Sequence, residues 1–140
     1  MKRLSIIVLV LLSAVFLVSM VSADGNGGAN FVGLWQGVDV NDGSLRTISI
    51  SDNDRDGYFE VLLHDEYWSL CGDGRGAYNG FGSINSEGKL FVQGTLFCSP
   101  SGTATNLSVT YDFVRFSDTL IEDPGNEFLE PGTLHRISSR

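Results

Sequence analysis

The chain has 140 residues, of which 42% are hydrophobic and two are cysteine. Its 17 acidic residues outnumber its 9 basic residues, and the resulting net charge of −8 argues against a nucleic-acid partner because it repels phosphate backbones. A chain of this length holds one domain with one modest core, which leaves no room for a second domain.

The first residues are typical of a secretory signal peptide. Met1-Lys2-Arg3 is positively charged, Leu4 to Val21 is apolar almost throughout, and Val21-Ser22-Ala23 offers the small residues of a cleavage site. We predict a signal peptide over residues 1–23, whose removal leaves 7 basic and 17 acidic residues. The mature net charge is then −10, and the protein is secreted. The alternative is an uncleaved membrane anchor, because Leu4 to Val21 spans 18 residues, the lower limit for crossing a bilayer.

The remainder divides into a short lead-in and one β-rich domain. Residues 24–30 are rich in Gly and Asn and predict a flexible lead-in. From Phe31 onward, short runs of β-branched and aromatic residues alternate with turn residues, which indicates an antiparallel meander that closes into a barrel or a sandwich. The predicted strands are Val32–Val40, Leu45–Ser51, Tyr58–His64, Tyr67–Cys71, Gly76–Asn85, Lys89–Cys98, Leu107–Phe116, Thr119–Glu122 and Thr133–Ser138.

Alternation within the strands predicts which side chains face the core. Phe59, Val61 and Leu63 share one face of their strand, and residues 107, 109, 111 and 113 share one face of another. Residues 90–97 are apolar on both faces, so we expect that strand to be covered on both sides or its outer aromatics to lie under the terminal segment. Residues 78–82 form either a strand whose glycines permit sharp coiling or a loop.

Asp52, Asp54 and Asp56, followed by Gly57, resemble the first half of a calcium-binding loop, in which hard oxygens converge on one cation. The second half is missing, because the twelfth position holds Leu63 rather than Glu. We favour a solvated hairpin turn, with calcium as the alternative. No other cofactor is expected.

The sequence contains no motif of an enzyme. His64 and His135 are the two histidines, and neither accompanies a nucleophile elbow, an HExxH pattern or a glycine-rich phosphate loop. Asp65 and Glu66 are adjacent, so they point apart rather than flank a substrate bond. We therefore expect a protein that is not an enzyme.

Aromatic residues are the candidate ligand-binding surface. Tyr67, Trp68, Tyr78 and Phe81 bracket Cys71 and are expected either to line the mouth of a barrel or to pack in its core. Asn106-Leu107-Ser108 fits a glycosylation acceptor.

Cys71 and Cys98 form an even count in an exported chain, which predicts one disulfide. A loop of this size gives about 3 to 4 kcal/mol of stabilisation in the loop-entropy model. A redox or metal role is the alternative, although the two cysteines lie 27 positions apart rather than in CxxC spacing.

Gly33-Leu34-Trp35 at the start of the first strand and Arg136 in the last strand resemble the lipocalins and the wider calycin superfamily. The resemblance implies a lipocalin-like barrel of about eight or nine strands over residues 31–140. It also implies structural roles for Trp35 and Arg136, with the guanidinium lying across the indole at one end.

The resemblance further implies a function, the binding of a small apolar or amphipathic molecule. The alternative is an extracellular protein-interaction module, such as an inhibitor or cell-surface component, with a filled barrel. We expect a monomer with no membrane span after signal cleavage.

Overall fold

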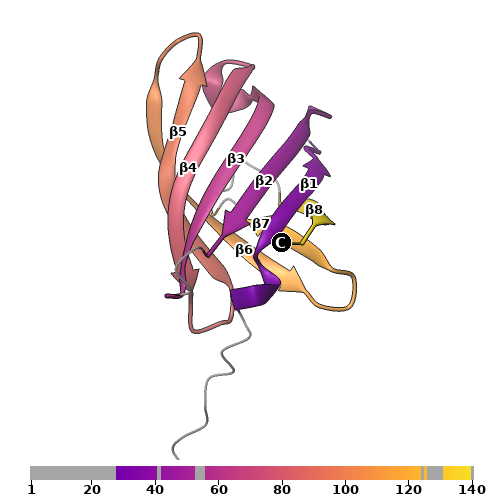
Figure 1. Ribbon diagram of the computed structural model, residues 1–140. Coiled ribbons are helices and arrows are strands. Elements are labelled where there is room, and N and C mark those ends of the chain that lie inside the picture. The colour runs from indigo at the N-terminus through magenta and orange to yellow at the C-terminus, as the bar shows by residue number, and fades with distance from the viewer. Residues whose placement is uncertain (1–27, 41, 53–55, 124, 126–130, 140) are drawn as a thin grey trace, which may run out of the picture.

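The computed structural model describes residues 28–40, 42–52, 56–123, 125 and 131–139. The predicted signal peptide and most of the predicted lead-in lie outside these residues. Figure 1 shows that the strands wrap into a barrel, and short 3₁₀ helices lie near its two ends. The elements in chain order are η1 (Gly28–Asn30), β1 (Gly33–Val38), β2 (Leu45–Ser51), β3 (Tyr58–Trp68), η2 (Ser69–Cys71), β4 (Gly74–Ile84), β5 (Leu90–Ser99), β6 (Ala104–Val114), β7 (Thr119–Asp123) and β8 (Gly132–Ser138).

The predicted antiparallel meander barrel is confirmed, with eight strands. Each strand pairs with the next, and β8 returns to pair with β1, so the sheet closes on itself and the sandwich is excluded. The closing ladder is short: it joins Leu34 to Ser138, Trp35 to Arg136 and Gln36 to His135, with a register shift between Leu34 and Trp35.

The two ends of the barrel differ in what they carry. We call the end that holds η2 and the β1–β2 and β5–β6 connections the disulfide end, and the end that holds η1 and the β2–β3, β4–β5 and β6–β7 connections the tryptophan end. In Figure 1 the disulfide end is at the top and the tryptophan end at the bottom. A meander produces this division because its connections alternate between the two ends.

The predicted alternation is confirmed, because every second residue of the strands enters the core. Phe59, Val61 and Leu63 of β3 are buried, as are Val109 and Tyr111 of β6. Large side chains cross the interior, and those with the least exposure include Phe31, Trp35, Phe59, Tyr78 and Tyr111.

Residues 78–82 belong to a strand, so the loop alternative is wrong. Gly80 of β4 lies directly opposite Gly94 of β5. A Cβ added to Gly94 would lie 2.2 Å from the carbonyl oxygen of Asn79 and 2.5 Å from the Cα of Gly80. The two strands therefore approach each other at a point where only glycine fits, which permits the tight coiling of a small barrel.

Two expectations about strands are corrected. Tyr67–Cys71 is not a separate strand: β3 continues through a register shift between Asp65 and Trp68, and η2 follows it. A bulge inserts an extra residue, so the alternation of inward and outward side chains shifts by one position while the strand continues. Phe91 and Phe97 of β5 are 40% and 54% exposed, so their strand is not covered on its outer face.

Candidate functional site

The tryptophan end is closed by the predicted contact between Trp35 and Arg136. The guanidinium carbon lies 4.0 Å from the centre of the fully buried indole ring. Arg136 also donates hydrogen bonds to the carbonyl oxygens of Val32 and Asn30, each at 2.5 Å, and to the carboxylate of Asp118. The indole Nε1 of Trp35 donates to the carbonyl of Phe31 at 2.8 Å. These contacts tie η1, β1 and β8 together, so both residues stabilise the closure.

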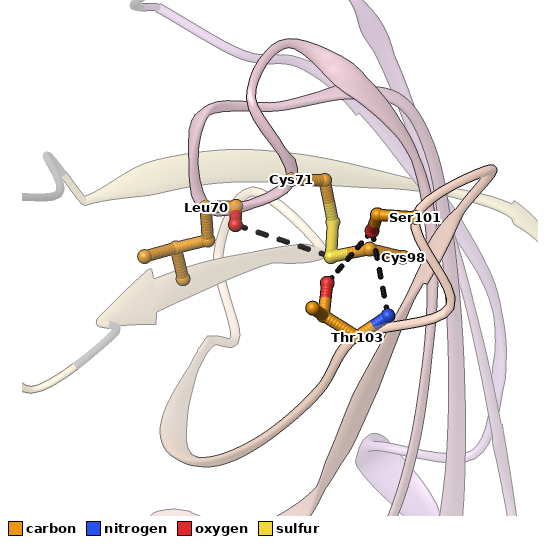
Figure 2. The surroundings of a disulfide bond; sticks show 5 residues. All are labelled: Leu70, Cys71, Cys98, Ser101 and Thr103. Atoms are coloured by element: carbon orange, nitrogen blue, oxygen red, sulfur yellow. Dashed lines mark hydrogen bonds between the residues drawn. A yellow bond between two sulfur atoms is a disulfide. The ribbon is translucent and has the colours of Figure 1, made fainter.

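The disulfide end is held by the predicted bond between Cys71 and Cys98, so the two sulfurs are bonded to each other and the metal-ligand alternative is wrong. Figure 2 shows the bond joining η2 to the end of β5, with the Sγ of Cys98 3.9 Å from the carbonyl oxygen of Leu70. In the turn that follows β5, the hydroxyls of Ser101 and Thr103 lie 2.8 Å apart. The bond thus fixes the connection between β3 and β4 to the neighbouring hairpin.

A cluster of charged side chains lies inside the barrel near the disulfide end, and sequence reasoning missed it. Arg46 of β2 donates through Nε to Asp65 of β3 at 3.0 Å and through one terminal nitrogen to Glu122 of β7 at 2.5 Å. Its other terminal nitrogen contacts Asp39, which follows β1. Asp65 and Glu122 are 0% and 3% exposed. Arg46 therefore joins its own strand β2 to three other parts of the barrel circumference.

The carboxylates of this Arg46 cluster have further partners. Asp65 accepts hydrogen bonds from the hydroxyl of Ser44 at 2.7 Å and from the amide of Tyr67 at 3.2 Å. Glu122 accepts one from the hydroxyl of Tyr111 at 3.4 Å. Since buried charges are stable only when they are paired and hydrogen-bonded, the cluster meets the condition for burial.

The pKa values reflect this burial. Desolvation by itself lowers the pKa of Arg46, but Glu122, Asp65 and Asp39 outweigh it and the pKa is raised, so the guanidinium stays charged. Desolvation raises the pKa of Glu122 above 4.5, although Arg46 opposes the shift. Desolvation and the charge of Glu122 raise the pKa of Tyr78 to about 12 and that of Tyr111 well above 10. Both phenols are therefore neutral hydrogen-bond donors at physiological pH.

Trp68 lies beside the cluster. The guanidinium of Arg46 lies 5.4 Å from the centre of its ring. Its Nε1 is buried and has no hydrogen-bond partner among the described residues. A Cβ on Gly76 would lie 2.5 Å from the indole Cδ1, so the glycine at this inward position of β4 makes the space that the ring fills.

A small hollow opens between β1 and β8 beyond the last pair of their ladder. It has a volume of about 10 Å³ and is lined by residues that include Gly37, Arg46, Glu122 and Thr133. A volume of this size holds one water molecule at most. It does not accommodate an organic ligand.

The outer surface of the barrel carries a larger apolar area. We call the outward side chains of β3, β4 and β5 the β3–β5 face. Its exposed large apolar residues are Tyr58, Leu62, Tyr67, Phe81, Phe91 and Phe97. An open hollow of about 450 Å³ extends from this face over β2 and β1, and its lining includes Leu34, Thr47, Leu62, His64, Ala77 and Phe97. The barrel therefore presents its accessible apolar surface on the outside.

The structure does not bring the four predicted ligand-binding aromatics into one site. Trp68 and Tyr78 lie inside the barrel, and the hydroxyl of Tyr78 donates to the carbonyl of Leu107 at 3.3 Å. Tyr67 and Phe81 are exposed on the outside. The bulge before Trp68 explains the division at adjacent positions 67 and 68, because it shifts the alternation by one residue.

The predicted calcium residues lie at the β2–β3 connection. Asp56 accepts a hydrogen bond from the amide of Tyr58 at 2.9 Å, the geometry of a turn stabilised by an aspartate. One carboxylate oxygen of Asp52 is buried without a partner among the described residues, and Asp54 lies outside them. Within the described ranges, no group of three His, Cys, Asp or Glu residues is arranged to hold a metal ion.

The two histidines lie on the outer surface in one row of paired residues. His135 pairs with Gln36, Gln36 with Thr47, and Thr47 with His64. Three strand spacings, about 14 Å in all, therefore separate them. At that distance they cannot act on the same bond. Asn106 is exposed and accepts a hydrogen bond from Thr95.

Alternation along the strands contained the signal for the Arg46 cluster. Arg46 is in phase with the buried Ile48 and Ile50, and Asp65 is in phase with Val61 and Leu63. A charged residue at an inward position predicts a buried partner of opposite charge. The pairing itself depends on strands that are distant in sequence and not adjacent in the sheet, such as β2 and β7, whose side chains meet across the interior.

Comparisons with known proteins find no relative of this chain. No protein-family model matches the chain, and no similar protein is found among curated sequences or solved structures. In the part of the chain that the structure describes, no helix is long and apolar enough to span a membrane.

Proposed function

We propose that this protein is an exported binding module that contacts a partner protein through the β3–β5 face. The observation that supports this function is the exposure of three phenylalanines, two tyrosines and a leucine on one face, with Tyr58 and Phe81 at 67% and 60%. Aromatic side chains are enriched in protein interfaces, where a few of them contribute most of the binding energy.

The charge distribution also supports an interface on this face. The mature chain has a net charge of −10 by our interpretation of the leader, yet the outward residues of β3, β4 and β5 include only Glu60, Glu66 and Arg75 among Asp, Glu, Lys and Arg. Depletion of charge is typical of the centre of an interface, because charges there must be desolvated.

The interior supports the alternative of a filled barrel rather than a ligand cavity. Trp35, Tyr78 and Tyr111 point inward and are at most 1% exposed. The Arg46 cluster occupies the same interior near the disulfide end. Side chains of this size fill the space that an eight-stranded barrel would otherwise offer to a ligand.

Secretion and membership of the calycin superfamily remain part of this proposal. The disulfide supports export, because such bonds persist in oxidising compartments. The contact between Trp35 and Arg136 in a closed eight-stranded meander supports the resemblance to lipocalins.

Site-specific photo-crosslinking tests the proposed function. A photoreactive phenylalanine analogue replaces Phe81 or Phe97, and the mature protein is incubated with the exported proteins of the producing cell. The control position is Phe116, which is fully exposed in the β6–β7 turn. We expect one discrete adduct from positions 81 and 97 and none from 116. The same adducts from all three positions, or none, would contradict a specific interface on the β3–β5 face.

A small apolar or amphipathic ligand is the second candidate. The hollow of about 450 Å³ on the outer surface falls within the usual range for ligand sites, about 300–1,000 Å³, and it combines apolar side chains with His64 and Asn79. This candidate predicts that an apolar dye gains fluorescence on the protein and that Leu62→Arg abolishes the gain. A protein-interaction module predicts no saturable dye binding.

A further inference from the structure

We infer that the partner presents a basic side chain, arginine or lysine, to Glu60, flanked by apolar side chains that cover Tyr58 and Phe81. This inference rests on the proposed function, since it specifies the chemistry of the partner at the β3–β5 face. It is supported by the position of one carboxylate and by the charges that surround it.

Glu60 lies on the β3 side of the apolar area, between exposed apolar residues of its own strand. In the sheet it pairs with Phe81 of β4 on one side and with Ser51 of β2 on the other. Along its own strand, the next outward residues are Tyr58 and Leu62, both exposed. Glu60 itself is only partly exposed, because these neighbours flank it. A partner that covers the aromatic side chains therefore also covers this carboxylate.

The carboxylate of Glu60 has no ion pair or hydrogen bond within the described residues. Three other strand carboxylates have cationic partners, because Asp65 and Glu122 are bound by Arg46 and Asp112 lies 3.9 Å from Lys89. Glu66 also has no partner among the described residues, but it lies further along β3 from Tyr58 and Phe81. The one basic residue on the β3–β5 face is Arg75, which lies six residues from Phe81 along β4. That separation is about 20 Å at the rise of an extended strand, too far for an intramolecular pair.

Covering an unpaired carboxylate has a high cost in free energy, because the ion loses its hydration without gaining a partner. A partner that buries this area therefore gains affinity from a cation placed opposite Glu60. The net charge of the whole molecule acts in the same direction, since it attracts basic partners over long range and repels acidic ones.

The same charges disfavour a second copy of the chain as the occupant. Two copies that met through this face would bring their Glu60 carboxylates into one interface, and Arg75 near the disulfide end is its only basic residue. Like charges in a desolvated contact are destabilising. The partner is therefore a different protein with a basic and apolar segment.

The test uses two fluorescent synthetic peptides with the same leucine and tyrosine residues at alternate positions, and with either arginine or glutamine at the central polar position. Binding to the mature protein is measured by fluorescence anisotropy. We expect the arginine peptide to bind about five- to tenfold more tightly, as for a partly desolvated charged hydrogen bond. The ratio of the two dissociation constants, glutamine peptide over arginine peptide, should fall close to one in the Glu60→Gln variant.

The control is Glu66→Gln, which removes the same charge from an exposed position nearer the disulfide end of β3. It should leave the ratio unchanged, because the long-range attraction is altered equally in both variants. An equal fall of the ratio in both variants would show that only net charge acts and would overturn the inference.

Further outcomes separate the inference from the proposed function. Phe81→Ser should weaken both peptides, since it removes apolar contact area. If it does so while Glu60→Gln has no effect, the interface stands and the basic partner is wrong. If neither peptide binds at millimolar concentration, or if sedimentation shows a dimer that Phe81→Ser dissociates, the inference is overturned.

Discussion

At the scale of single residues, Arg46 is the most informative side chain of the barrel interior. It is the cation that balances Asp65 and Glu122, which are almost completely buried. Replacing a buried ionic cluster with apolar residues can be neutral, but removing one member leaves an uncompensated charge. The contribution of the Arg46 cluster to stability is therefore best measured by substituting one member at a time.

Arg46→Met should lower the free energy of unfolding by about 3–5 kcal/mol, because Asp65 and Glu122 would be left buried without their cation. Arg75→Met, on the exposed face of β4, is the control and should change it by at most about 0.5 kcal/mol. Urea denaturation of both variants gives the comparison. A loss below about 1 kcal/mol for Arg46→Met would mean that water reaches the carboxylates.

The pH dependence of stability should reveal Glu122. Because burial raises its pKa above 4.5, the native state binds a proton more tightly than the unfolded chain. Ionisation of Glu122 therefore lowers the free energy of unfolding as the pH rises through the native pKa. Relative to Glu122→Gln, which cannot ionise, the wild type should gain stability as the pH falls from neutral toward 4.5, with no further change in the difference below that value.

Denaturant titrations of the wild type and Glu122→Gln at several pH values measure this difference, and groups common to both proteins cancel. If the wild type loses stability relative to the variant on acidification, Arg46 holds the pKa of Glu122 below its ordinary value instead.

At the scale of elements, close approach between strands depends on the Gly80–Gly94 pair. Gly94→Ala would place a Cβ 2.2 Å from a backbone oxygen of β4, so the strands must separate. We expect a loss of about 1–3 kcal/mol in the free energy of unfolding, the usual range for overpacking. The control is Gln93→Ala, at the adjacent outward position, which should change the free energy of unfolding only slightly. Equal effects for the two substitutions would argue against the close approach.

The disulfide joins two connections at the same end of the barrel. Replacing Cys71 and Cys98 with Ser should lower the free energy of unfolding by about 3–4 kcal/mol, because the unfolded chain regains the freedom of a long loop. Thermal or urea denaturation of the double variant tests this. A variant as stable as the wild type would mean that the native hairpins alone fix this end.

Local pattern was sufficient to predict most of the strands. The alternation of Phe59, Val61 and Leu63 identified the inner face of β3. The turns after β1 and β4 place Gly43 and Gly88 at positive φ, the conformation for which tight turns favour glycine. The pattern failed at Tyr67–Cys71, since a bulge depends on the partner strand rather than on local sequence.

At the scale of the whole molecule, the sequence predicted the closure but not the surface that follows from it. Trp35 and Arg136 could be matched because a Gly-x-Trp in the first strand and an arginine in the last strand resemble the calycin pattern, which implies this contact. The β3–β5 face could not be predicted in the same way. Tyr58, Phe81 and Phe91 become neighbours only through the registers of three strands. The same residues in another register would be scattered over the surface.

The pairing of β1 with β8 also determines whether the chain can be circularly permuted. Ser138 lies beside Leu34, so the start and the end of the domain are adjacent in space. Domains with neighbouring termini tolerate circular permutation. A permuted gene that opens at the Asn85–Lys89 turn and joins Ser138 to Phe31 by a short glycine linker should therefore yield the same far-ultraviolet circular dichroism and no free thiol. Cargo fused next to Phe31 or Ser138 would be displayed at the tryptophan end, remote from Cys71 and Cys98.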